Sequence, residues 1–236
     1  MKGRGRERRL FGVRILHEDP DVIVVEKAAG VLSQATRRDE GRDVESVLSD
    51  YVRKGQWKSR ARVYLVHRLD RETAGVMMVA KSETVQERFR NAWGEMTKKV
   101  YLAGVEGTLS ATSGAFEGYL REDENMYMRL SHDPSQGKFA RTEWRLVAQD
   151  RDSALAEATL KTGRKNQIRV QFAAAGHPVV GDSKYGHGRK GQALQLLAWR
   201  LSFIHPHSGE WMTFEASLPQ WVGKYLPKGV GMEALT

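Results

Sequence analysis

Short apolar runs of strand length recur along the chain, and few segments with helical periodicity separate them. The runs 13–16 and 22–25 flank an Asp-Pro-Asp turn, which is typical of a β-hairpin. Apolar residues three and four apart predict a helix over 42–54, and Ser82 suits the N-cap of another helix that ends near residue 93. Further strand-like or mostly apolar segments are expected at 63–66, 76–80, 99–105, 126–130, 139–148, 154–160, 194–204 and 211–216, and helices at 167–175 and 219–225. Because strands and helices do not alternate regularly, the pattern predicts an α+β fold with a central mixed, largely antiparallel sheet flanked by helices and loops.

The length of the chain allows one sizeable domain, or two subdomains that share a core. A polar stretch with glycines at 107–115 predicts a turn between two halves. We therefore expect subdomains at about 13–106 and 107–236. Residues 1–12 are basic and lack apolar periodicity, which is typical of a flexible arm.

Missing residue types exclude several kinds of chemistry. The chain has no cysteine, so disulfides, thiolate catalysis and a Cys-ligated zinc site are impossible. The histidines are scattered, and His205 and His207 alternate around Pro206 as in a turn, so we expect no metal. No apolar run approaches the roughly 20 residues that span a bilayer, and no signal-type segment follows the basic N-terminus. A cytoplasmic protein without a membrane anchor is therefore expected.

The positive charge of the chain is concentrated in a few stretches. The formal net charge is +9, which alone is compatible with any soluble basic protein. The clustered cations are Arg53, Lys54, Lys58, Arg60, Arg62, Arg68 and Arg71 around the single acid Asp70, then Lys161, Arg164, Lys165 and Arg169, and five basic residues among the first ten. Clusters of this kind are typical of proteins that bind the phosphate backbone of a nucleic acid.

Asp70 lies between two strand-like runs, in the sequence His-Arg-Leu-Asp-Arg-Glu-Thr-Ala-Gly. Its neighbours Arg68 and Arg71 favour the ionised carboxylate, and an ionised aspartate on a loop can act as a nucleophile. The alternative is a surface ion pair without a catalytic role. The residues alone favour the ion pair, because exposed Asp–Arg neighbours are common.

Two other stretches carry candidate site residues. Gly163 is expected to open a helix whose amides can meet a phosphate, with Arg164, Lys165 and Arg169 adding charge; a solvated basic face is the alternative. The glycines at 176, 181 and 186 indicate tight turns. On the strand expected at 99–105, Lys99 and Tyr101 share one face. Tyr101 can act as an acid or base, or simply pack, and periodicity does not separate these cases.

Taken together, these motifs resemble the RluA-type family of RNA pseudouridine synthases. The matching patterns are His-Arg-Leu-Asp-x-x-Thr-(small)-Gly at 67–75, Lys-x-Tyr-Leu-Ala at 99–103, Gly-Arg-x-x-Gln-Ile-Arg-Val at 163–170 and Gly-His-Pro-x-x-Gly-Asp-x-x-Tyr-Gly at 176–186. The resemblance covers about 13–215, with the motifs in the family's order and spacing.

The resemblance implies a pseudouridine synthase fold with an active-site cleft between two subdomains. It implies isomerisation of uridine in structured ribosomal or transfer RNA, after base flipping and without a metal or redox cofactor. Asp70 would be the nucleophile, Tyr101 would stack on the target base and is a candidate general base, and Arg169 would pair with Asp70. Arg68 would help to fill the space left by the extruded base. The expected RNA-binding and base-binding residues are Arg68, Arg71, Lys99, Arg164, Lys165 and Ile168.

Four positions differ from the usual family pattern, namely Ala28 (usually Pro), Ala74 (often Ser), Asn166 (often His) and Leu197 (often His). None of them removes a carried-over catalytic group, and they bear on hydrogen bonding around the site and on the choice of RNA. The family often carries an N-terminal S4-type RNA-binding domain, which we do not expect before the first strand here. RNA selection would then fall to the catalytic domain and the basic arm.

Two other classes of function compete with the isomerase. A catalytically silent RNA-binding or chaperone-like protein could keep the fold, but the intact Asp70, Tyr101 and Arg169 argue against it. A glycoside hydrolase would need a second carboxylate at a motif position, and the motifs contain none in that role. A monomer is expected.

Overall fold

The computed structural model describes residues 9–35, 42–56, 58–189 and 191–226. The chain divides into two compact units. The first unit runs to Thr97 and also contains Arg200–Ala216, and the second contains Lys98–Trp199 and the chain from Ser217 onward. The chain therefore enters the first unit twice.

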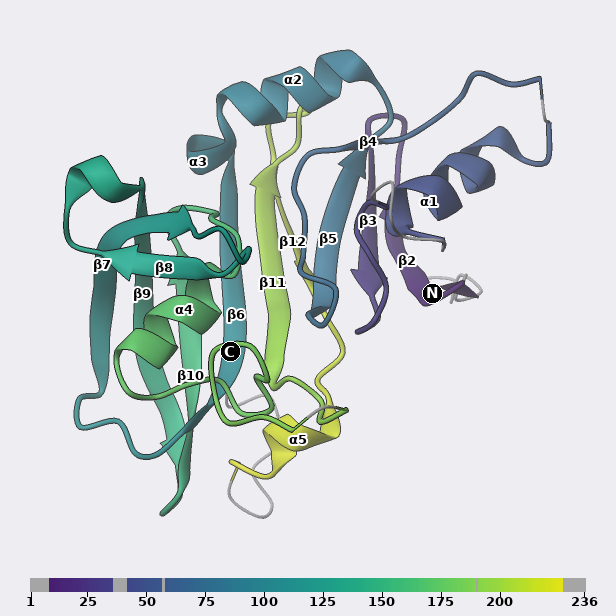
Figure 1. Cartoon of the computed structure of the whole chain (residues 1–236). Helices are drawn as coiled ribbons and strands as arrows, with labels where there is room; N and C mark the ends of the chain where they lie inside the picture. Colours follow the sequence, from purple (N-terminus) through teal and green to yellow (C-terminus); the bar gives the residue numbers. More distant parts are fainter. Residues whose placement is uncertain (1–8, 36–41, 57, 190, 227–236) are drawn as a thin grey trace. The chain divides into compact units, whose positions relative to one another are not determined.

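An antiparallel sheet forms the centre of the first unit (Figure 1). Strands β1 (Arg9–Leu10), β2 (Val13–Glu18), β3 (Val22–Lys27) and β5 (Ala74–Ala80) pair in that order, and β4 (Tyr64–Leu65) pairs with the end of β5. Residues Arg200–Ile204 of β11 (Leu196–Ile204) form a hairpin with β12 (Trp211–Glu215). The helices of this unit are α1 (Val44–Arg53), α2 (Glu83–Asn91) and α3 (Trp93–Met96).

The core of the first unit explains why its strands appear in the sequence as continuous apolar runs. Ile23 and Val24 of β3 and Met77 and Met78 of β5 are completely buried, although successive residues point to opposite faces. A strand that is covered on both faces needs apolar residues at every position. Phe89 of α2 is also completely buried.

Side-chain caps set the start of the two longer helices in the first unit. Asp43 accepts a hydrogen bond from the Ser46 N–H at 2.7 Å, and the Asp43 N–H donates to Ser46 Oγ at 3.1 Å, which is a capping box. Ser82 accepts from the Val85 N–H at 3.2 Å, as its position in the sequence predicts. Both helices therefore begin where the polar cap residue precedes the apolar pattern.

The second unit contains a second run of antiparallel strands. Strands β6 (Thr97–Glu106), β10 (Ser153–Leu160), β9 (Lys138–Gln149), β7 (Ser113–Glu122) and β8 (Met128–Ser131) pair in that order, and β6 begins on the last residue of the first unit. The helical segments are η1 (Pro134–Gln136), α4 (Gln167–Ala174) and α5 (Gln220–Gly223). Val170 of α4 joins Leu120, Met128 and Ala140 of the strands in one buried cluster. This contact fixes α4 against the strands in the second unit.

The α+β class and the antiparallel pairing are confirmed, but three details differ from the sequence-based expectation. Strand β7 begins at Ser113, near the end of the segment predicted as a turn at 107–115, and runs on to Glu122, where no strand was expected. Its glycines make room for neighbouring strands. A Cβ on Gly114 would lie 2.9 Å from the Trp144 ring, and one on Gly118 would lie 2.7 Å from Leu130. Because of these small residues, the sequence lacks the apolar pattern of a strand here, although β7 pairs along most of its length with β9.

The other two differences concern boundaries. The two units separate at Thr97 instead of near residue 106, because β6 pairs with β10 of the second unit, and the return of Arg200–Ala216 to the first unit was not expected. Of the basic arm predicted at 1–12, residues 1–8 lie outside the described part, and Arg9–Leu10 form β1 against β2. Among the described helices, none has the length and apolar character that a membrane crossing requires.

Candidate active site

Asp70 lies in the first unit, on the turn that leads from β4 into β5. The Thr73 N–H donates to the Asp70 carbonyl at 3.1 Å, and Leu69, on the other side of Asp70, is buried. The Asp70 side chain is half-buried between the exposed Arg68 and Arg71. We call residues 69–73 the Asp70 turn.

The loop after β3 holds the Asp70 turn on both sides of the aspartate. The buried Ser33 hydroxyl donates to the Leu69 carbonyl at 2.8 Å and accepts from the Leu69 N–H at 3.0 Å. The Gly30 N–H donates to the Arg71 carbonyl at 2.7 Å, and Arg71 Nε donates back to the Gly30 carbonyl at 3.2 Å. These bonds leave the backbone on either side of Asp70 little freedom to move.

Lys27, the last residue of β3, adds a buried cation beneath the Asp70 turn. Its side chain is completely buried, and Nζ donates to the carbonyls of Ala28 at 3.1 Å, Val31 at 2.7 Å and Arg71 at 3.2 Å. Burial lowers the pKa of Lys27 to about 8, and the negative charges of Asp70 and Glu72 act in the opposite direction. The ammonium therefore braces the turn and places positive charge near the Asp70 carboxylate.

His67 of the same motif has a structural partner. Its Nε2 accepts a hydrogen bond from the Met78 N–H at 3.1 Å, so the proton of the neutral ring is on Nδ1. The ring also packs on Trp93, with 5.0 Å between the ring centroids. Thr73 is nearly completely buried, and its hydroxyl finds no hydrogen-bond partner within the described part of the chain.

Tyr101 and Lys99 lie on β6 in the second unit, and both are buried. As predicted, they share one face, since they pair with Ala158 and Leu160 of β10, which are also two residues apart. Burial lowers the pKa of Lys99 to about 8. A Cβ on Gly163 would lie 3.0 Å from Lys99 Nζ, so the Gly163 loop lies next to the end of the Lys99 side chain.

The expectation that Gly163 opens a helix is wrong. Helix α4 begins at Gln167, and Asn166 precedes it in the left-handed conformation without capping it through its side chain. Gln167 instead turns its side chain back: Oε1 accepts from the Arg164 N–H at 2.9 Å and from the Thr162 hydroxyl at 2.8 Å. The residues from 163 to 166 therefore form a folded loop, and the Gly163 amide does not lie at a helix start.

Arg169 forms the most enclosed ion pair in this part of the chain. Its Nε and Nη2 donate to the two carboxylate oxygens of Asp182, each at 2.7 Å, and both side chains are buried. Asp182 also accepts from the N–H groups of Lys184 at 2.9 Å and Tyr185 at 3.0 Å. Burial alone would raise the pKa of Asp182, but these bonds and the charge of Arg169 outweigh it and lower the pKa below the ordinary value. The guanidinium also lies over the Tyr185 ring, 5.3 Å from its centroid.

The residues expected to bind RNA fall into two groups. Arg68, Arg71, Arg164 and Lys165 are exposed, whereas Lys99 and Ile168 are buried. Arg164 Nε donates to the Phe139 carbonyl at 2.9 Å, and Lys165 pairs with Glu122. Their contact with RNA stays a prediction.

Sequence reasoning missed two residues that support this chemistry. Asp182 was part of a recognised motif, but its pairing with Arg169 was not foreseen. Lys27 was not singled out at all, because it follows Glu26 at the end of β3 and nothing in the sequence signals that its side chain is buried. Among the departures, Asn166 Oδ1 accepts from the Tyr185 hydroxyl at 3.0 Å, and that hydroxyl accepts from the Met128 N–H at 3.1 Å.

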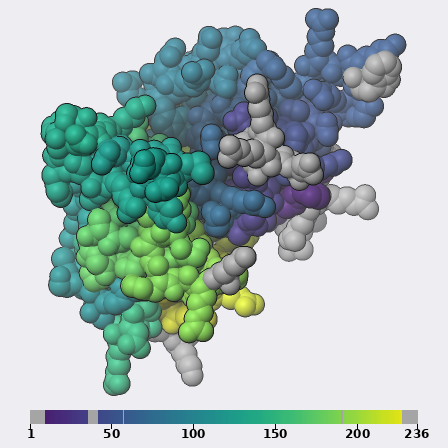
Figure 2. Space-filling view, viewed as in Figure 1, coloured from purple at the N-terminus to yellow at the C-terminus, as the bar shows by residue number. Residues whose placement is uncertain are grey.

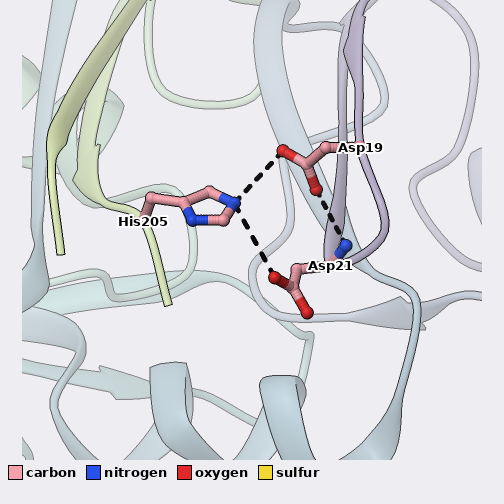
Figure 3. Close-up of side chains that lie close together, drawn as sticks. All are labelled: Asp19, Asp21 and His205. Carbon is pink, nitrogen blue, oxygen red and sulfur yellow. Dashed lines mark hydrogen bonds and ion pairs between the residues drawn. The ribbon is translucent and has the colours of Figure 1, made fainter. Parts of the chain in front are cut away.

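Asp19, Asp21 and His205 form a possible cation-binding group in the first unit, with one ligand atom from each within 4.8 Å of the others (Figure 3). The hydrogen bonds argue against a metal there. His205 Nδ1 accepts from the N–H groups of His207 at 3.2 Å and Ser208 at 3.1 Å, so the ring proton is on Nε2, which faces Asp19 Oδ2 at 3.2 Å. A metal on Nε2 would require Nδ1 to donate instead. The contact between His205 and Asp19 therefore joins the Asp-Pro-Asp turn at 19–21 to the turn that begins at His205. The turn predicted at 205–207 is confirmed.

Comparison with known proteins shows the class of enzyme: the chain is an RNA-modifying enzyme. The model of the RNA pseudouridylate synthase family matches residues 21–174, and the chain belongs to this family. An uncharacterized RNA pseudouridine synthase of Aquifex aeolicus is 34% identical over 226 residues, 88% of this chain and 70% of the relative. The ribosomal large subunit pseudouridine synthase D of Neisseria meningitidis (strain Z2491) is 34% identical over 220 residues, which cover 87% of this chain and 58% of the relative.

Solved structures support the fold. Human RNA pseudouridylate synthase domain containing 4 matches with a TM-score of 0.67 at 24% identity, over 88% of this chain and 89% of that one. Human RNA pseudouridylate synthase domain containing 1 matches with a TM-score of 0.68 at 22% identity, over 91% and 87% of the two chains. The resemblance to pseudouridine synthases is thus confirmed, and the chain isomerises uridine in RNA.

Proposed function

We propose that this chain converts one or more uridines of ribosomal or transfer RNA to pseudouridine, with Asp70 as the nucleophile. The observation that carries the proposal is the support of the Asp70 turn. Ser33, Gly30 and Lys27 hold the backbone around a half-buried carboxylate, which is more than a surface ion pair needs. A nucleophile gains from such support because the reacting atoms must be held in place.

The reaction breaks the N1–C1′ bond of uridine, turns the freed uracil and forms a C5–C1′ bond. The proton on C5 is lost and N1 gains one, so no oxidant or reductant is consumed. The Asp70 carboxylate would either attack C1′ or assist the departure of uracil while a base takes the C2′ proton. The uridine must first leave its stack at a cost of a few kcal/mol.

Tyr101 and Arg169 would serve Asp70 in the roles that the motifs assign to them. Tyr101 would stack on the flipped base, which offsets part of the unstacking cost. Arg169 would pair with the Asp70 carboxylate and hold it ionised. A guanidinium has five N–H donors, and the pair with Asp182 uses one on Nε and one on Nη2.

The names of relatives favour ribosomal RNA as the substrate. Two of the similar proteins, from Neisseria meningitidis and Nitrosomonas europaea, are named ribosomal large subunit pseudouridine synthase D. We therefore propose ribosomal RNA before transfer RNA, with the chain acting as a monomer in the cytoplasm.

The test is a complementation experiment with Asp70→Ala. Pseudouridines are mapped in RNA from cells that lack this protein and from the same cells carrying the wild type, Asp70→Ala or Asp50→Ala. Asp50 is a matched control because it is an exposed aspartate of the same unit, paired only loosely with Arg53 at 3.6 Å. Wild type and Asp50→Ala should restore the missing pseudouridine, and Asp70→Ala should not. Restoration by Asp70→Ala would refute the nucleophile, and binding of RNA by a wild type that restores nothing would favour the catalytically silent alternative.

A further inference from the structure

We propose that the loop between α1 and β4 is an RNA-backbone contact remote from the Asp70 turn, a proposal that rests on the proposed function and deepens it. We call residues 53–56 and 58–62 the α1–β4 loop. It carries Arg53, Lys54, Lys58, Arg60 and Arg62, and residues 53–62 contain no acid. Figure 2 shows this part of the chain, in blue, projecting from the surface at the upper right. Such a concentration of positive charge suits the phosphates of a nucleic acid.

Hydrogen bonds give the α1–β4 loop a defined backbone. The Lys54 N–H donates to the Tyr51 carbonyl at 3.1 Å where α1 ends, and the Gln56 N–H donates to the Arg53 carbonyl at 2.9 Å. Arg53 Nε donates across the loop to the Ala61 carbonyl at 3.0 Å. Arg53 is thus used inside the loop, and the exposed Lys54, Lys58 and Arg60 are presented outward from an ordered frame.

A cavity of about 250 Å³ adjoins the loop, and three cations line it. Lys54, Arg62 and Lys81 line this cavity together with Glu18 and Tyr51. Lys81 pairs with Glu18 at 3.1 Å, and the Tyr51 hydroxyl donates to the same carboxylate at 2.7 Å. Arg62 pairs with Glu83 at 3.0 Å, so Lys54 supplies the positive charge of the lining that these two ion pairs do not offset, and the cavity suits a phosphate group of the RNA.

The α1–β4 loop and the Asp70 turn lie at opposite ends of strand β5. The loop leads into β4, whose Tyr64 pairs with Ala80 at the end of β5. The Asp70 turn precedes Ala74 at the other end of β5. With a rise of about 3.3 Å per residue, the two ends of β5 are roughly 20 Å apart. A contact at this distance selects for an RNA that extends well beyond the flipped uridine.

The test measures binding of a fluorescein-labelled RNA hairpin with a 20-base-pair stem between 50 and 200 mM salt. The triple variant Lys54→Ala, Lys58→Ala, Arg60→Ala should bind at least tenfold more weakly than wild type at low salt. The slope of log affinity against log salt should fall by about 2 to 3, since each phosphate contact contributes about 0.9. Arg60→Ala alone should lower the slope by about 1.

A second triple variant controls for net charge. Arg129→Ala, Arg141→Ala, Arg145→Ala removes the same three charges from cations that already pair with Asp123, Glu117 and Glu157. Its salt slope should stay close to that of wild type. Equal slopes for the loop variant and wild type, or equal losses in both triple variants, would overturn the proposal.

The binding test of the α1–β4 loop and the Asp70→Ala test of the nucleophile can fail independently of each other. Asp70→Ala should bind the hairpin as wild type does, and its loss of pseudouridine formation tests the nucleophile alone. If the loop variant keeps the wild-type slope while Asp70→Ala abolishes pseudouridine, the loop proposal fails and the nucleophile stands. If the loop variant loses affinity while Asp70→Ala still forms pseudouridine, the loop proposal stands and the nucleophile fails.

Discussion

Replacing Asp182 by alanine removes one half of the buried ion pair that fixes Arg169. The guanidinium then loses two hydrogen bonds of 2.7 Å, and it stays in a site where its side chain is only 6% exposed. Leaving one partner of a buried pair uncompensated costs about 3–5 kcal/mol of unfolding free energy. For a chain of this length, each kcal/mol lowers Tm by about 2–4 °C, so we expect a fall of roughly 6–20 °C.

The assay is urea unfolding followed by circular dichroism, with a thermal scan alongside it. Arg145→Ala is the matched control, because Arg145 also pairs through two nitrogens with one carboxylate, Glu157, but its side chain is 50% exposed. Exposed pairs contribute about 0–1 kcal/mol, so this variant should lose little stability. The result that would refute the reasoning is an Asp182→Ala protein within about 1 kcal/mol of wild type.

A double variant separates the stranded charge from other effects of the substitution. Replacing buried ion pairs by apolar residues is often neutral or stabilising. Asp182→Ala combined with Arg169→Met should therefore be more stable than Asp182→Ala alone. A double variant that is less stable than the single variant would show that the stranded charge is not the cause.

Three further predictions concern stability. Lys27→Met takes the Nζ donor from the carbonyls of Ala28, Val31 and Arg71 and should cost about 1–3 kcal/mol in urea unfolding; a variant as stable as wild type would contradict this. Gly181→Ala should be clearly less stable than Gly176→Ala, because both glycines have positive φ but only at 181 would a Cβ meet a backbone oxygen, that of Ala193, at 2.1 Å; equal thermal stability would contradict it. The depressed pKa of Asp182 stabilises the fold above its ordinary value of 3.8, and this contribution is lost as the pH falls through the folded pKa. Asp182→Asn should therefore show a shallower loss of stability on acidification than wild type in acid titrations, and parallel curves would contradict it.

The sequence predicted those elements whose local signals agree with their packing. The strands predicted at 22–25 and 76–80 are apolar at every position because both faces are covered, and Ser82 begins a helix because its hydroxyl caps it. Strand β7 escaped prediction because its glycines fit against Trp144 and Leu130, which lie far away in the sequence. A glycine that makes room for a side chain from another strand leaves no local sequence pattern that indicates this contact.

The sequence likewise predicted only part of the candidate site. The motifs pointed to Asp70, Tyr101 and Arg169 through their resemblance to the family pattern, and the roles of these side chains stay a prediction. They did not reveal that Asp182 holds Arg169, nor that Lys27 braces the Asp70 turn. Both contacts depend on how loops fold over strands, which no periodicity encodes.

The most direct test of the account follows the hydrogen on C5 of uridine. Pseudouridine formation joins C5 to C1′ and releases that hydrogen, so RNA labelled with tritium at C5 of uridine should release tritium to water. Total RNA from cells that lack this protein, labelled in this way, is incubated with the purified wild type or with Asp70→Asn, which keeps the shape of the side chain and removes its charge. The account predicts tritium release with wild type and none above background with Asp70→Asn. Release at equal rates by both proteins would contradict the claim that the Asp70 carboxylate is the nucleophile.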